Sequence, residues 1–109
     1  MRAPERSLRT QLWNLAERRR YLAGLDALAL SLRGDAERLR VAASASGNLA
    51  ERQAALAGQE MVERSIADVE TRLAAARNAV AEAALAVKRH QAAGRIRALH
   101  GRAPRPRRR

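Results

Sequence analysis

Two stripes of apolar residues at helical spacing, one in each half of the chain, constrain the fold more than any other feature. In the first half, leucines recur in steps of three, four and seven, at positions 8, 12, 15, 22, 25, 28, 32 and 39. In the second half, alternating heptad a and d positions are occupied by Val62, Ile66, Val69, Leu73, Ala76, Val80, Ala83 and Val87. These spacings predict two long helices that pair along heptad seams.

A cluster of small turn-forming residues, Ser44 to Asn48, separates the two stripes. Gly47 suits the position just after a helix, where φ is usually positive. Asn48 followed by Glu51 has the spacing of a capping box, with Asn in place of the usual Ser or Thr. The cluster therefore predicts the end of one helix and the start of another.

Folding the chain at this turn brings the two stripes together in an antiparallel register. The facing pairs are Leu8 with Val87, Leu12 with Ala83, Leu15 with Val80, Leu22 with Leu73, Leu25 with Val69, Leu28 with Ile66, and Leu32 with Val62. The predicted fold is all-α, an antiparallel coiled-coil hairpin over residues 1–97. Its helices span about 5–44 and about 49–97, with a turn at 45–48, and a basic disordered tail follows at 98–109.

Three polar residues interrupt the predicted seam. Asp35 and Gln59 fall opposite each other, with Gly34 and Gly58 beside them. This layer is either a solvated, slightly kinked segment near the hairpin tip or a hinge that fixes the register. Arg19 also falls on the seam, where its methylenes allow the charge to reach solvent.

Composition argues against an enzyme. Ala, Leu, Arg and Glu dominate, as in long helices and coiled coils. There is no cysteine, and the two histidines, His90 and His100, have no acidic partner nearby in sequence. The glycines lack the spacing of a phosphate-binding loop. We therefore expect no catalytic residue, no metal site and no cofactor. Neither a secretory signal nor a membrane span is predicted, which suggests a cytoplasmic protein.

Positive charge accumulates toward the C-terminus. The chain has a formal net charge of +11, and the stretch from Lys88 to Arg109 holds nine basic residues and no acidic one. The hairpin register places this stretch at the open end of the rod. The candidate partner-binding residues are Arg18, Arg19, Arg20, Lys88, Arg89, Arg95 and Arg97.

Three classes of function fit these charges. A protein-binding stalk would dock its basic end on acidic surfaces. A nucleic-acid binder would place the Arg-rich tail and residues 18–20 on phosphates, although aromatic residues for base stacking and reader motifs are absent. A membrane-surface helix fits least, because the face opposite the seam is expected to be too polar and to lack apolar insertion residues near the tail. No membrane insertion is expected.

The second helix resembles that of FliJ-like proteins, the central stalks of flagellar and type III secretion export ATPases. The similar segments are Ile66 to Glu70, Ala75 to Ala83 and Val87 to His90. The resemblance implies a non-enzymatic rod that binds a hexameric export ATPase and the export gate. The chain is shorter than typical members, and the Arg-rich tail is not part of the family pattern. A two-helix rod alone is marginal, so packing on a partner or self-association is expected.

Overall fold

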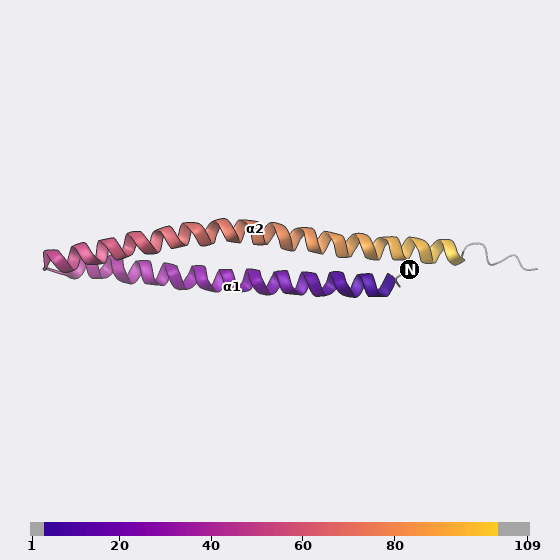
Figure 1. The fold of residues 1–109 in the computed structure, drawn as a ribbon, viewed down its shortest axis with the longest axis horizontal. Coiled ribbons are helices and arrows are strands. Elements are labelled where there is room, and N and C mark those ends of the chain that lie inside the picture. The colour runs from indigo at the N-terminus through magenta and orange to yellow at the C-terminus, as the bar shows by residue number, and fades with distance from the viewer. Residues whose placement is uncertain (1–3, 103–109) are drawn as a thin grey trace, which may run out of the picture. The chain divides into compact units, whose positions relative to one another are not determined.

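The fold is seen in a computed structural model, which describes the backbone of residues 4–102 and the side chains of residues 7–100. The chain forms an antiparallel helical hairpin of two helices, α1 (Pro4–Ala45) and α2 (Leu49–Arg102) (Figure 1). Continuous helix is possible because no proline occurs between Pro4 and Pro104. The predicted fold class is confirmed over the described residues.

The helix ends agree closely with the sequence, with one difference. α1 begins and ends within one residue of the expected bounds, and α2 begins at the expected Leu49. α2 ends at Arg102, five residues beyond the expected end at 97. Residues 98–102 are therefore helical rather than part of a disordered tail, because they contain no helix-breaking proline. The rest of the expected tail, residues 103–109, lies outside the described residues.

The turn is closed by hydrogen bonds from three residues. The Asn48 side chain accepts a 3.0 Å bond from the backbone N–H of Glu51, which confirms the predicted N-cap. In a capping box the Glu51 carboxylate would accept a hydrogen bond directly from the Asn48 N–H. Here the Ser46 hydroxyl stands between them, because it accepts from the Asn48 N–H and donates to the Glu51 carboxylate. Arg52 donates a 2.9 Å bond to the Ser46 carbonyl. No described glycine has a positive φ, so the conformation expected for Gly47 is wrong, and the side-chain bonds stabilise the turn instead.

The hairpin comprises two compact units, which are described separately. Unit 2, Arg20–Arg77, contains the turn and one apolar cluster. The buried members of that cluster are Leu25, Ala29, Val69, Leu73 and Ala76, with Leu22 and Leu32 packed against them. Its residues come from both helices, as the antiparallel register predicts.

Unit 1 combines Met1–Arg19 with Asn78–Arg109. Its apolar cluster is built on buried Leu15, Ala83 and Val87, with Leu8, Val80 and Ala84 packed against them. The expected neighbours Leu8 and Val87 belong to this one cluster. Both clusters consist mainly of Leu from α1 against Val and Ala from α2, which allows the helix backbones to approach closely.

Two predicted seam residues, Leu12 and Leu28, do not lie in the core. Each is 45% exposed, whereas Ala29 is 1% exposed and faces the partner helix. The physical reason is that an α-helix has 3.6 residues per turn, so a strict heptad drifts by about 20° per repeat. Arg19, also expected on the seam, is exposed.

The two polar seam residues near the turn, Asp35 and Gln59, each form a hydrogen bond within their own helix. Asp35 accepts a hydrogen bond from Arg38, and the Gln59 amide donates a 3.2 Å bond to Glu63. A Cβ added at Gly58 would lie 3.4 Å from Leu39, so the small residue lets this leucine pack closely. This arrangement favours a solvated segment over a polar lock that fixes the register.

Candidate functional site

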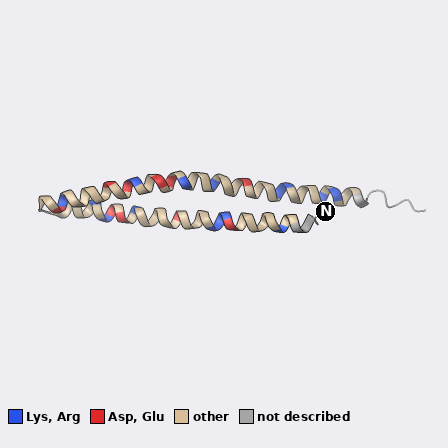
Figure 2. Ribbon diagram, viewed as in Figure 1, with Lys and Arg blue, Asp and Glu red and all other residues tan. Residues whose placement is uncertain are grey.

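Charge is divided unequally between the two units. Unit 2 contains eight basic and eight acidic residues in the sequence. Unit 1 contains fourteen basic and three acidic residues, so it carries the entire formal net charge of +11. Figure 2 shows mixed blue and red along the part of the hairpin near the turn, and blue alone toward the described end of α2. The positive charge is thus a property of one unit.

The charges of unit 2 are paired across and along its helices. Between the helices, Arg33 contacts Glu70 at 2.9 Å and Arg77 approaches Asp26 to 3.6 Å. Within single helices, the ion pairs are Arg38 with Asp35, Arg40 with Glu37, and Arg72 with Asp68. With equal numbers of basic and acidic residues paired in this way, unit 2 has little net electrostatic potential at its surface.

The ion pair between Arg40 and Glu37 shifts the pKa values of both residues. A hydrogen bond from Arg40 lowers the pKa of Glu37 below its ordinary value, and the same bond raises the pKa of Arg40. Both side chains are exposed, so solvent screens their attraction. The pair indicates local charge compensation and not a reactive centre.

Unit 1 presents most of the predicted partner-binding residues on its surface. Lys88, Arg89, Arg95 and Arg97 are exposed along one stretch of α2. No acidic residue follows Glu82 in the sequence, so this stretch contains no internal counter-charge. The stretch is therefore a basic surface that has no carboxylate of its own.

Within unit 1, Arg18 and Arg19 do not lie beside that stretch. Leu8 packs in the same cluster as Val87, so Lys88 lies near the start of α1. Arg18 is ten residues further along α1, about 15 Å away along the helix axis. Arg18 and Arg19 are exposed in unit 1, whereas Arg20 belongs to unit 2. Arg18 and Arg19 and the basic stretch of α2 therefore occupy different levels of unit 1.

α2 extends beyond the described start of α1. In the register of unit 1, Pro4 lies level with about Gln91, and α2 continues to Arg102 (Figure 1). An open groove of about 450 Å³ lies at this step. It is lined by Leu8, His90, Gln91, Gly94, Arg95, Arg97 and Ala98. The end of α2 thus offers a helix surface that no described part of α1 covers.

The outer face of this part of α2 carries an exposed apolar stripe, so the expectation that the face opposite the seam lacks apolar residues near the tail is wrong. We call Leu85, Ala92, Ile96 and Leu99 the outer stripe. They follow one another at steps of seven, four and three, so they share a helix face. Buried Ala83 and Val87 are each two residues from Leu85, about 200° around the helix. The spacing was visible in the sequence, but the stronger seam stripe in the same segment obscured it.

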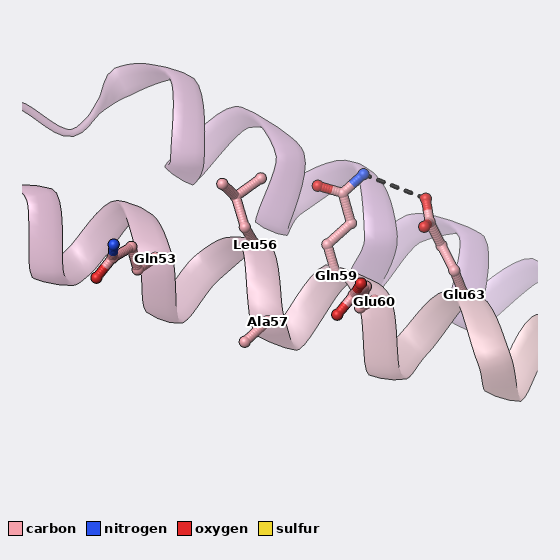
Figure 3. A pocket seen from close by; sticks show the side chains of 6 residues that line it. All are labelled: Gln53, Leu56, Ala57, Gln59, Glu60 and Glu63. Atoms are coloured by element: carbon pink, nitrogen blue, oxygen red, sulfur yellow. Dashed lines mark hydrogen bonds between the residues drawn. The ribbon is translucent and has the colours of Figure 1, made fainter.

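Unit 2 also contains an open groove of about 460 Å³, lined only by residues of α2. Figure 3 shows these residues, Gln53, Leu56, Ala57, Gln59, Glu60 and Glu63, with the Gln59 amide directed at Glu63. The two carboxylates have no histidine, hydroxyl or thiol among the lining residues. The groove offers no nucleophile and base pair of the kind that acyl or phosphoryl transfer needs.

The described residues offer neither a membrane-spanning segment nor a cluster of metal ligands. Neither helix has a stretch long and apolar enough to cross a membrane over its described residues. No group of three or more His, Cys, Asp or Glu side chains within that part of the chain is arranged to hold a metal ion. The basic stretch and outer stripe of unit 1 are the best candidates for a functional surface. No protein-family model, curated protein or solved structure matches the sequence.

Proposed function

We propose that the protein is a non-enzymatic, cytoplasmic coiled-coil stalk or adaptor of a bacterial flagellar or type III protein-export apparatus. It docks through the basic surface of unit 1 on acidic surfaces of the export ATPase hexamer and the export gate. The observation that carries the proposal is the division of charge, in which unit 2 is neutral and unit 1 carries +11. The choice of the export ATPase and the export gate as partners rests on the resemblance of residues 66–90 to FliJ-like stalks.

The two units suit different tasks in such an adaptor. Unit 2 pairs its charges and packs its own apolar cluster, so it forms a neutral body. Unit 1 presents exposed Lys88, Arg89, Arg95 and Arg97 on a stretch of α2 that has no acidic residue after Glu82. Complementary charge of this kind accelerates encounter and fixes orientation more than it adds affinity.

A capture experiment with the purified export ATPase and the cytosolic part of the export gate tests the proposal. The full chain is expected to bind, and the double variant Arg95→Gln/Arg97→Gln to bind more weakly through slower association. The matched control, Arg64→Gln/Arg72→Gln, removes the same charge from unit 2 and should bind as the parent does. Equal weakening by both variants, or recovery of nucleic acid alone, would contradict the proposal.

The same charge asymmetry supports a second candidate, a nucleic-acid-associated protein that uses the basic tail on phosphate backbones. Such binding requires an affinity for generic duplex DNA that falls steeply with salt. Fluorescence anisotropy with a labelled duplex, measured over a salt series, separates the two candidates. The adaptor proposal requires that the ATPase still binds at salt concentrations where the duplex is released.

A further inference from the structure

The outer stripe lies beside the basic residues of the proposed adaptor surface, but the adaptor role gives its apolar side chains no task. Leu85, Ile96 and Leu99 are among the exposed large apolar residues of the described chain, with Ile96 55% and Leu99 64% exposed. Their face points away from the seam that α1 covers. An exposed apolar stripe on a helix that already has a buried seam needs a second explanation.

Basic side chains border the outer stripe on both sides. Rotation by about 100° per residue places Lys88 and Arg95 along one border. Arg89 and His100 lie along the other border, about 16 Å apart along the axis, and Glu82 precedes them on that border. All four side chains are exposed, and no acidic side chain follows Glu82. From Lys88 onward, the face is therefore an apolar line with basic side chains on both edges.

We infer that this face is a docking surface for an anionic lipid bilayer, with α2 of unit 1 lying in the plane of the membrane interface. An interfacial helix needs a narrow apolar face that enters the acyl boundary and basic edges that reach the headgroups. Arginine and lysine achieve this because their long apolar stems extend past the stripe while the charge stays in water. This surface contact is not insertion across the bilayer.

Two features favour a bilayer over the other polyanions. A phosphate backbone makes no use of Leu85, Ile96 and Leu99, and the described part of unit 1 beyond Asn78 has no Phe, Tyr or Trp side chain for base stacking. The cations lie on both edges of the stripe rather than on one, which matches the laterally continuous charge of an anionic leaflet. The stripe is short and buries little apolar area, so binding to the bilayer depends on attraction between the basic side chains and anionic headgroups.

Vesicle co-sedimentation of the full chain tests the inference. The chain is expected to bind vesicles with about 30 mol% phosphatidylserine in about 0.1 M NaCl, and not vesicles of phosphatidylcholine alone. The variant Ile96→Ser/Leu99→Ser should weaken binding about tenfold or more. The matched control Val41→Ser/Leu30→Ser removes similarly exposed apolar residues from unit 2 and should bind as the parent does.

A fluorescent label separates insertion of the stripe from simple charge attraction. The chain has no cysteine, so Leu99→Cys and Leu30→Cys each create a single labelling site. A polarity-sensitive dye at position 99 should shift to the blue on anionic vesicles, and one at position 30 should not. Equal shifts, no vesicle binding, or binding that Ile96→Ser/Leu99→Ser leaves unchanged would each overturn the inference. Failure here leaves the ATPase capture result untouched, so the two proposals fail separately.

Discussion

Arg33 of α1 donates a 2.9 Å hydrogen bond to Glu70 of α2, and one heptad away Arg77 of α2 approaches Asp26 of α1 to 3.6 Å. In the first contact α1 supplies the cation and α2 the anion, and in the second contact the roles are reversed. A shift of α2 by one heptad would bring Asp26 beside Glu70 and replace attraction with repulsion. The apolar seam tolerates such a shift better, because it repeats every seven residues. The ion pairs therefore discriminate between registers that the seam leaves similar.

The Arg33–Glu70 contact should contribute modestly to stability. Both side chains are about half-exposed, so a coupling energy of about 0.3–1 kcal/mol is expected from a double-mutant cycle. Arg33→Glu should lower the midpoint of urea unfolding, and Arg33→Glu with Glu70→Arg should recover most of it. High salt should shrink the difference. A swapped variant no more stable than Arg33→Glu would show that the contact does not form in solution.

Leu73 should be among the costliest positions to truncate. Its side chain is 3% exposed at the centre of the unit 2 cluster, so Leu73→Ala leaves a cavity and should cost about 2–4 kcal/mol. Leu30→Ala, on the exposed surface of the same unit, should change the free energy of unfolding by less than about 0.5 kcal/mol. Circular dichroism during thermal unfolding measures both. Similar losses in the two variants would place the core elsewhere.

Gly24→Ala should stabilise the hairpin. Gly24 lies inside α1, and a Cβ there would meet nothing within 4 Å. Alanine reduces the conformational entropy of the unfolded chain, so a gain of about 0.5–1 kcal/mol is expected. Chemical denaturation with an unchanged m-value would confirm it. A loss of stability would mean that another molecule or copy packs against this position.

The turn should depend on Asn48. Its side chain caps α2 through the Glu51 N–H, so Asn48→Ala should cost about 1 kcal/mol and Asn48→Asp little. Hydrogen exchange at the first turn of α2 should accelerate in the alanine variant. Unchanged protection there would mean that the Ser46 bonds close the turn without the cap.

Glu37 should titrate at a lower pH than an ordinary glutamate, because Arg40 hydrogen-bonds its carboxylate. A pKa that is depressed in the folded state stabilises the fold above the ordinary pKa, and this contribution disappears as the pH falls through the folded pKa. Arg40→Gln should raise the Glu37 pKa toward its ordinary value, as followed by NMR of the side-chain carboxyl. An identical titration midpoint in both proteins would refute the interaction.

The sequence by itself determined the helix ends near the turn. Asn48 and Glu51 specify a local hydrogen-bond pattern, and local patterns are readable without tertiary information. It also determined the antiparallel pairing, because Leu8 with Val87 and Leu22 with Leu73 fall into shared clusters. The hydrogen bonds of Ser46 and the φ of Gly47 could not be predicted from the sequence, because they depend on the path the backbone takes through the turn.

Which side of each helix is buried was decided only by tertiary packing. Leu28 fits the heptad but is exposed, while Ala29 beside it is buried, because the contact between two α-helices drifts across their faces relative to a strict heptad. The outer stripe was overlooked because its residues follow helical spacing just as the seam residues of the same segment do. Sequence spacing fixes which residues share a face, and only the packed partner helix decides which face remains open to another molecule.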